Sequence, residues 1–211
     1  MPGNKKNVKK ILEGLQKAYP AVKTQLEHNS PFQLLIATML SAQCTDKQVN
    51  SVTPALFARA STPEEIMELP LKELEELIHA TGFFHTKAKR VKECAAALME
   101  KHGGVVPRDM ESLLALPGVG RKTANVVLNA AFEIPGIVVD THVQRISQRL
   151  GFTKFKDPVK IEFDLMKLLP KESWIDFSLH LIYHGRAVCT ARKPKCGECT
   201  LAEWCKGAGK F

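Results

Sequence analysis

The chain has 211 residues, 45% of them apolar, which is enough for a substantial core in one large domain or two small ones. The charged start has no apolar segment behind it, and the longest apolar run, FQLLIATML, is too short to span a bilayer. These features argue against secretion and membrane insertion, so we expect a cytoplasmic protein. Thirty Lys and Arg against 22 Asp and Glu give a net charge of +8, which is typical of a polyanion binder.

The order of apolar residues and helix signals predicts helices along most of the chain. Val8, Ile11 and Leu15 have helical spacing, and Ser30 is an N-cap before a first-turn proline, Pro31. Further helices are expected from a capping box at Thr62 and Glu65, from glycine stops at Gly82, Gly103 and Gly151, and from acidic caps at Asp109, Asp140 and Asp157. Alternating patterns are nearly absent, and PGIVVD is too short and isolated to pair as a strand. We therefore predict an all-α fold.

The segment LPGVGRKTANVVLNA, residues 116–130, contains a tight glycine turn that leads directly into a helix. Gly118 and Gly120 allow the backbone to approach another group closely, and the positive helix start suits a phosphate. A plain helix–helix turn would also use glycine. Because Arg121 and Lys122 follow the turn in a basic protein, contact with a DNA or RNA backbone is the better interpretation.

Four of the six cysteines lie within residues 189–205, and basic residues such as Lys193 and Lys195 stand between them. One C-x2-C pair flanked by single cysteines indicates a metal site, because four nearby thiolates can converge without long loop closures. Without an export signal, disulfides are the poorer interpretation. The residues alone leave zinc and iron open, although the single close pair argues weakly against zinc. A second basic group, residues 87–92, is either a solvated surface or a further contact for the polyanion.

These motifs together resemble the endonuclease III family of DNA glycosylases. The resemblance rests on LPGVGRKTA, on VVDTHVQR at 138–145, on LSAQCTDKQV at 40–49, and on the cysteine spacing, in the right order along nearly the whole chain. It implies an all-α, two-lobed helix-hairpin-helix fold with the DNA groove between the lobes. Residues 24–134 would form a six-helix lobe, and residues 1–23 with 135–211 would form a discontinuous iron–sulfur lobe.

The resemblance also implies an activity and a cofactor. The protein would be a monomeric, nucleoid-associated repair enzyme that removes oxidised pyrimidines from damaged double-stranded DNA and cleaves the strand by β-elimination. A structural 4Fe-4S cluster would pin a loop whose Lys193 and Lys195 face DNA phosphates, and Cys44 and Cys94 would remain as buried thiols. The implied cluster ligands are Cys189, Cys196, Cys199 and Cys205.

Catalysis is expected at Lys122 and Asp140. A solvated lysine is protonated at neutral pH and becomes a nucleophile only when its surroundings favour the neutral amine. With the family pattern around it, Lys122 is expected to attack C1′ of a flipped nucleotide and form a Schiff base. Asp140, also expected to cap a helix, would stabilise positive charge on the sugar. His142 is equally suited to a phosphate contact or a partly buried helix position.

Two residues are candidates to fill the space that a flipped base leaves. The resemblance assigns insertion to Gln43, whose amide can bind the orphaned base, and a stacking wedge to Phe83. Leucine followed by tyrosine is common in that loop, whereas this chain has Phe83 and Phe84. Phe83 could alternatively pack in the core, and Gln43 could simply end a helix.

Two other functions fit part of the pattern. A monofunctional mismatch or adenine glycosylase shares the fold, but such relatives typically lack this lysine and carry an additional recognition domain. A non-enzymatic DNA-binding protein whose cluster senses redox state would have no use for Lys122 and Asp140 together.

Overall fold

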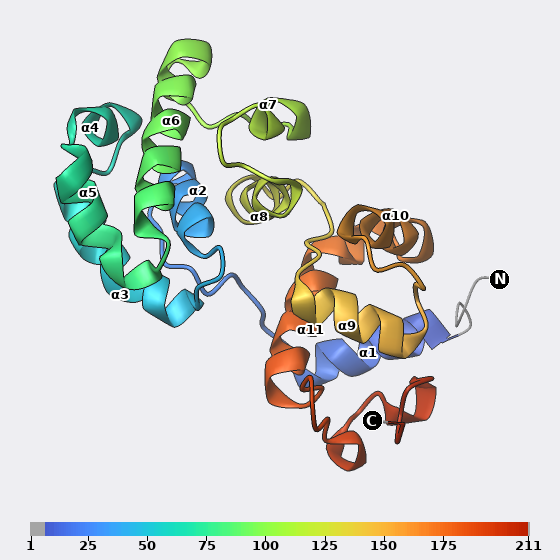
Figure 1. Ribbon diagram of the computed structural model, residues 1–211. Coiled ribbons are helices and arrows are strands. Elements are labelled where there is room, and N and C mark those ends of the chain that lie inside the picture. The colour runs from blue at the N-terminus through green and yellow to red at the C-terminus, as the bar shows by residue number, and fades with distance from the viewer. Residues whose placement is uncertain (1–6, 211) are drawn as a thin grey trace. The chain divides into compact units, whose positions relative to one another are not determined.

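The computed structural model describes residues 7–210, which divide into two compact units. One unit comprises residues 24–134, and the other combines the N-terminal segment up to Lys23 with residues from Pro135 onward (Figure 1). The described residues contain helices and no strand, which confirms the predicted all-α class. Among residues 7–210, none of the helices combines the length and the apolar composition of a membrane-spanning segment.

The unit of residues 24–134 is built around α2, whose residues Phe32–Leu40 are all buried. Ser30 caps α2 through Gln33 N, and α3, α6 and α8 pack against it. A helix that is apolar on every side belongs in the centre of a lobe, because it has no face suited to water. The helices of this unit are α2 (Pro31–Leu40), α3 (Asp46–Arg59), α4 (Pro63–Glu68), α5 (Leu71–Ile78), the 3-10 turn η2 (His79–Thr81), α6 (Phe84–His102), α7 (Met110–Leu114) and α8 (Arg121–Phe132).

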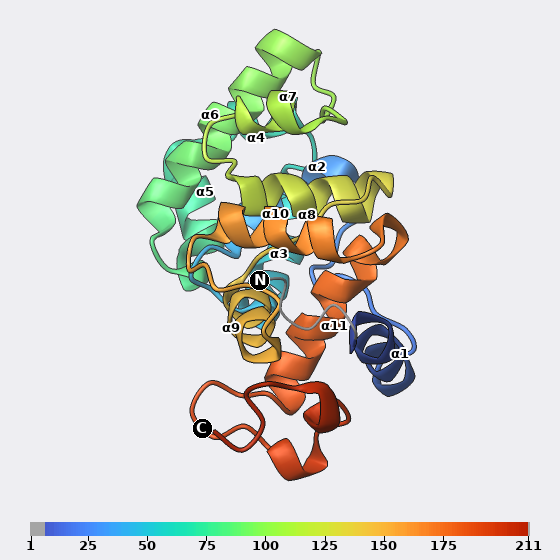
Figure 2. The ribbon, with the colours of Figure 1, turned by 90° about the vertical axis from the view of Figure 1, so that its right-hand side faces the viewer.

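The other unit joins the two ends of the chain. Ile11 and Leu15 of the N-terminal helix are buried in the same core as Ile146, Phe177 and Leu181. The N-terminal helix packs against the last long helix, as the turned view shows (Figure 2). The helices of this unit are α1 (Val8–Ala18), α9 (Thr141–Leu150), α10 (Pro158–Leu168), η3 (Lys171–Ser173), α11 (Trp174–Ala187), η4 (Cys196–Glu198) and η5 (Ala202–Trp204).

The predicted helix signals act as expected. Thr62 and Glu65 form the complete capping box, and Asp109, Asp140 and Asp157 each cap their helix through a side-chain oxygen. Gly103 and Gly151 end α6 and α9 in the left-handed conformation. Residues 135–139 have no regular secondary structure and pair with no strand among the described residues, as their short apolar run predicts.

Candidate functional site

The turn between α7 and α8 is pressed against the centre of its unit. Gly118 has a φ of +78°, and a Cβ added there would lie 2.9 Å from Met39 Cε and 3.1 Å from Arg90 Cβ. The Val119 amide closes the turn by donating to the Leu116 carbonyl at 3.1 Å. Both the conformation and the close packing require glycine at position 118.

The start of α8 faces open space. Gly120 is its N-cap, no side chain of the described residues caps it, and a Cβ at Gly120 would meet nothing within 4 Å. Arg121 is half-buried and Lys122 is exposed, both in the first turn. A positive helix end with two adjacent cations has the chemistry to bind a DNA phosphate.

Asp140 is held at the start of α9 by the backbone around it. The preceding segment is buried, and Val138 N donates to Ser178 Oγ at 3.0 Å. Asp140 Oδ1 accepts from Val143 N at 2.8 Å, which makes this half-buried residue the N-cap of α9. The cap uses one of the two carboxylate oxygens, so helix capping and a chemical role are compatible in one side chain.

His142 is a half-buried residue of α9 that packs tightly on α11. A Cβ at Gly185 would overlap the His142 ring, and Arg145 Nη2 donates to His142 Nδ1 at 3.1 Å. Burial lowers the pKa of His142, and Arg145 and Arg186 lower it further, while Asp140 opposes them. His142 therefore occupies the helix position that was one of its two predicted roles, and its contact with DNA stays a prediction.

Two arginines of α9 bind the cysteine loop, and sequence reasoning missed both. Arg145 Nη2 donates to the carbonyls of Cys189 at 2.9 Å and Gly185 at 3.2 Å. Arg149 Nη1 lies 3.2 Å from Cys189 Sγ and donates to the Thr190 carbonyl at 2.8 Å. The helix that begins at Asp140 thus also anchors the cysteine loop. The spacing of four residues, which places both guanidinium groups on one helix face, is the signal that could have revealed them.

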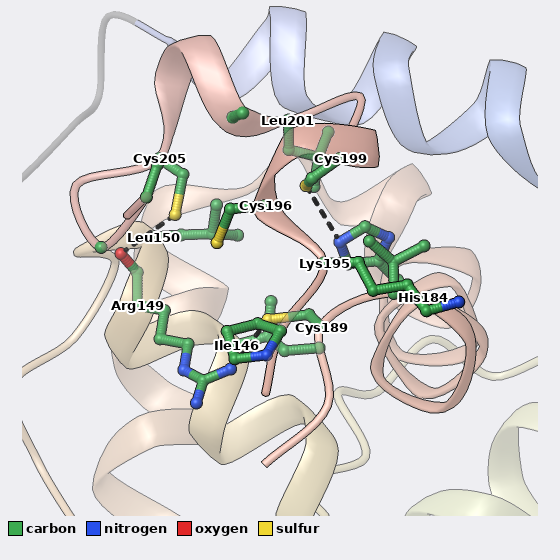
Figure 3. A pocket seen from close by; sticks show the side chains of 15 residues that line it. Ile146, Arg149, Leu150, His184, Cys189, Lys195, Cys196, Cys199, Leu201 and Cys205 are labelled. Carbon is green, nitrogen blue, oxygen red and sulfur yellow. Dashed lines mark hydrogen bonds between the residues drawn. The ribbon is translucent and has the colours of Figure 1, made fainter. Parts of the chain in front are cut away.

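The four cysteines of residues 189–205 line one pocket (Figure 3). All four are half-buried free thiols, and apolar side chains such as Ile146, Leu150 and Leu201 complete the lining. Burial raises the pKa of the Cys199 and Cys205 thiols, and Cys189 and Cys196 raise both further, while hydrogen bonds from backbone amides oppose the shift. Among the described residues, no group of three His, Cys, Asp or Glu side chains is arranged to hold a single metal ion. A sulfur-lined, largely apolar pocket fits the chemistry of an iron–sulfur group, whose ligands are cysteine thiolates.

A buried histidine connects this pocket to the N-terminal segment. His184 Nε2 lies 3.5 Å from Cys199 Sγ, and His184 Nδ1 lies 3.2 Å from the Tyr19 hydroxyl. Burial lowers the pKa of His184 to about 4, so the ring is neutral at neutral pH. A neutral ring that donates from Nε2 to the sulfur must accept from the Tyr19 hydroxyl at Nδ1.

The basic residues between the first two cysteines are exposed. Lys193 and Lys195 both lie on the surface of the loop, and Lys195 Nζ is 3.9 Å from Glu198. The Lys193 carbonyl accepts from Thr190 Oγ1 at 2.7 Å, which fixes the loop backbone beside them.

Gln43 and Phe83 lie on exposed turns of the unit of residues 24–134. Both adopt left-handed backbone conformations, with φ of 53° and 51°. Phe83 is 66% exposed, so the alternative that it packs in the core is wrong. The next residue, Phe84, is half-buried, and its ring centroid lies 4.4 Å from the ring centroid of His79.

Three other sequence-based interpretations are settled by burial. Cys94 is fully buried, which confirms the prediction for that thiol, and burial raises its pKa to about 12. Cys44 is only half-buried, because it lies in the exposed turn after α2, so the prediction of a buried thiol is wrong there. Lys87 is buried rather than part of a solvated or polyanion-binding surface.

Comparisons with known proteins place this site in a class. Residues 36–171 match the HhH-GPD superfamily of base excision DNA repair proteins, and residues 189–205 match the iron-sulfur binding domain of endonuclease III. Endonuclease III of Synechocystis sp. is 55% identical over 209 residues, covering 99% of this chain and 95% of that protein. Endonuclease III of Escherichia coli (strain K12) is 44% identical over 203 residues, covering 96% of each.

Solved structures agree with the sequence comparisons. A trapped covalent intermediate of Endonuclease III with DNA superposes with a TM-score of 0.93 at 44% identity, covering 98% of this chain and 97% of the other. A thermostable thymine-DNA glycosylase gives a TM-score of 0.87 at 25% identity, covering 98% of both chains. The chain belongs to the endonuclease III family.

Membership in this family settles the class of activity. The chain is a DNA-binding repair enzyme, a DNA glycosylase and AP lyase, and its cysteine loop binds an iron–sulfur cluster. The non-enzymatic alternative is thereby excluded.

Proposed function

We propose that the chain removes oxidised pyrimidines from double-stranded DNA and cleaves the resulting abasic site, with Lys122 as the nucleophile. The observation that carries this proposal is an exposed primary amine in the first turn of α8, directly after the open glycine turn. A positive helix start binds the phosphate backbone, so the amine lies next to the sugar of a bound strand. The covalent intermediate trapped for Endonuclease III supports a nucleophile supplied by the protein.

The proposed reaction passes through a covalent bond between Lys122 and the sugar. The neutral Lys122 amine forms a bond to C1′ of a flipped nucleotide, the bond from C1′ to the base breaks, and the base leaves with the electron pair and takes up a proton. The sugar ring opens to a Schiff base between Lys122 and C1′. Loss of a C2′ proton then breaks the bond from C3′ to its oxygen and releases the 3′ strand as a phosphate-ended product. Water hydrolyses the Schiff base and regenerates the amine.

We assign Asp140 the role of the carboxylate in this mechanism. As a general base it would accept a proton from the attacking amine, and its negative charge would stabilise positive charge on the sugar. The N-cap bond to Val143 N supports this role, because it holds the carboxylate in one orientation. Lys122→Gln and Asp140→Asn test the two assignments separately.

The DNA contacts are proposed from exposure and charge. Gly118 and Gly120 would let the turn approach a phosphate, with Arg121 beside it, and His142 would contact a second phosphate. The exposed Lys193 and Lys195 would bind phosphates beside the cysteine loop.

We assign Gln43 and Phe83 to fill the space that the flipped base leaves in the duplex. The Gln43 amide can hydrogen-bond the orphaned partner base, and the 66% exposed Phe83 ring can stack between base pairs.

The proposed cofactor is a 4Fe-4S cluster held by Cys189, Cys196, Cys199 and Cys205. The support is that all four thiols line one pocket and that Arg149 approaches Cys189 Sγ, where it would offset thiolate charge. The cluster would cross-link the loop and so hold its exposed Lys193 and Lys195 in place, rather than supply a chemical step. Purified under anaerobic conditions, the protein should be brown and contain about four iron and four sulfide per chain. A colourless protein with one zinc per chain would contradict this assignment.

We also propose a monomer that acts on the nucleoid in the cytoplasm. The net charge of +8 favours association with DNA over association between copies of the chain.

One assay separates the candidate activities. Duplex oligonucleotides bearing thymine glycol, uracil, an abasic site or an adenine mismatch are incubated with the purified protein, and base release and strand cleavage are measured separately. We expect base release and cleavage with thymine glycol, and cleavage at the abasic site. Release of adenine from the mismatch without strand cleavage would instead identify a monofunctional glycosylase.

A further inference from the structure

Lys87 is a buried lysine on α6 whose ammonium group binds two backbone carbonyls. Lys87 is only 8% exposed. Its Nζ donates to the Leu40 carbonyl at 2.9 Å and to the Thr81 carbonyl at 2.8 Å. Burial lowers the pKa of Lys87, and Cys44 partly offsets that shift. A buried cation is costly unless its donors are satisfied, so its presence here requires a structural or functional reason.

Both carbonyls lie at the C-terminal ends of helical segments. Leu40 is the last residue of α2, and Thr81 is the last residue of η2. Carbonyls in the last turn of a helix have no intrahelical partner, and the helix dipole places negative charge there. The Lys87 ammonium therefore stabilises two helix ends at one point.

The chain that follows each carbonyl carries one of the two proposed DNA-inserting residues. Gln43 lies three residues after Leu40, and Phe83 lies two residues after Thr81. Both adopt the left-handed conformation, which is unfavourable for residues other than glycine and persists only where the surroundings impose it. The Lys87 amide also donates to the Phe83 carbonyl at 3.0 Å, so Lys87 binds the Phe83 turn through both its backbone and its side chain.

The geometry points to Lys87 as a positioning residue that fixes the Gln43 and Phe83 turns relative to each other, so that both side chains enter the DNA together. This inference rests on the proposed roles of Gln43 and Phe83. Lys87 itself contacts neither DNA nor the reacting atoms. A base-flipping enzyme gains from such a connection, because two turns that are already aligned lose less conformational entropy when the DNA binds.

Lys92 provides a matched control on the same helix. Its ammonium group also donates to backbone carbonyls at a helix end, those of Ile66, Met67 and Leu69 at the end of α4. The segment that follows α4 carries neither proposed inserting residue. Lys87→Met and Lys92→Met therefore remove the same kind of interaction, but only the first removes it from the inserting turns.

The test compares these two variants in two assays at a temperature where both are folded. In the first, 2-aminopurine lies opposite a tetrahydrofuran abasic-site analogue, and its fluorescence reports unstacking of the orphaned base by the inserted side chains. We expect Lys87→Met to lose most of the fluorescence change at saturating protein, whereas Lys92→Met retains it. In the second, single-turnover excision of thymine glycol should slow by about tenfold or more in Lys87→Met, because small misplacements are costly, and remain near the parent rate in Lys92→Met.

A variant that lacks both inserting side chains distinguishes a positioning role of Lys87 from a general effect on stability. In a chain that carries Gln43→Ala and Phe83→Ala, Lys87→Met should slow excision no further, because there is nothing left to position. Equal effects of Lys87→Met and Lys92→Met, or a full additional effect of Lys87→Met in the alanine background, would overturn the inference.

The proposed function and this inference fail in different ways. Borohydride trapping at a pre-formed abasic site should persist in Lys87→Met, because Lys122 is intact and no base has to be flipped. Absence of trapping in the parent protein would overturn the proposed function instead. If Lys87→Met does not fold, Lys87→Gln and Lys92→Gln carry the same comparison, since the amide keeps two donors with a shorter reach. Failure of both Lys87 variants to fold would assign Lys87 to general stability and overturn the positioning role.

Discussion

The amine of Lys122 is the group on which the proposed mechanism depends. Replacing Lys122 with Gln removes the nucleophile but keeps a polar side chain at an exposed position, so the fold should be unaffected. Because the same amine expels the base and forms the Schiff base, both base excision and borohydride trapping should fall below detection, a loss of about a hundredfold or more. The measurements are single-turnover base release and adduct formation on thymine glycol duplexes.

Binding supplies the control for Lys122→Gln. The variant should still bind a tetrahydrofuran abasic-site analogue, because the glycine turn and Arg121 remain. Near-parental base release with loss of strand cleavage alone would mean that water displaces the base, and the bifunctional mechanism would be wrong.

Asp140 combines two roles that one substitution can separate. Asparagine can still accept the hydrogen bond from Val143 N and cap α9, but it lacks the negative charge. Asp140→Asn should therefore keep its melting temperature and its affinity for the abasic-site analogue, while turnover falls about a hundredfold. The comparison is Asp140→Ala, which loses the cap as well and should also melt at a lower temperature. Undiminished turnover in folded Asp140→Asn would remove the carboxylate from the mechanism.

The hairpin between α7 and α8 contains two glycines with different structural roles. Gly118 has a positive φ and no room for a Cβ, so Gly118→Ala should destabilise the protein by about 1–3 kcal/mol. Gly120 has an ordinary φ of −94° and open space in front of it, so Gly120→Ala should leave the unfolding temperature unchanged. The methyl group that Gly120→Ala adds would instead lie between the backbone and a phosphate, and would weaken DNA binding.

Thermal unfolding and duplex binding, measured on both glycine variants, test this division. The proposed phosphate contact at the turn would be wrong if Gly120→Ala bound duplex DNA as tightly as the parent protein.

The helices of this chain were predictable from local signals, because capping and chain termination depend on residues close in sequence. Thr62 with Glu65, Asp109 and Gly151 all act at the positions where the sequence predicts them. The α3 helix carries Pro54 in its interior, and its local start signal, the N-cap Thr45 that accepts from Gln48 N, was missed in the sequence.

Contacts between distant segments were not predictable in the same way. The Lys87 ammonium reaches a carbonyl 47 residues away, and Arg149 reaches Cys189 across 40 residues. In the sequence Lys87 looks like an ordinary surface cation, and the spacing of Arg149 from Arg145 shows a shared helix face but not what that face contacts. Only the packing of α6 against α2, and of α9 against the cysteine loop, gives them partners.

The unit that holds the cysteine loop is assembled from both ends of the chain. The loop itself contains only the two short turns η4 and η5, and Leu201 is the one apolar side chain of residues 189–205 that is fully buried in the core of that unit. Gly14 of α1 packs against Leu201 and Trp204, so the N-terminal helix covers part of the loop. A loop with so little regular structure depends on the cluster for order, because metal binding by cysteines supplies folding free energy directly.

The charge of the molecule leads to the last prediction. Binding to undamaged duplex should weaken steeply with salt, because Lys and Arg release counterions when they neutralise phosphates. Lys193→Glu with Lys195→Glu should weaken binding at low salt and reduce the slope of log K against log salt by about 0.9 for each lost contact. The control is Lys72→Glu with Lys167→Glu, which changes the same net charge at exposed positions of α5 and α10. If the two double variants lost affinity equally, the effect would come from net charge, and the cysteine loop would not be a DNA contact.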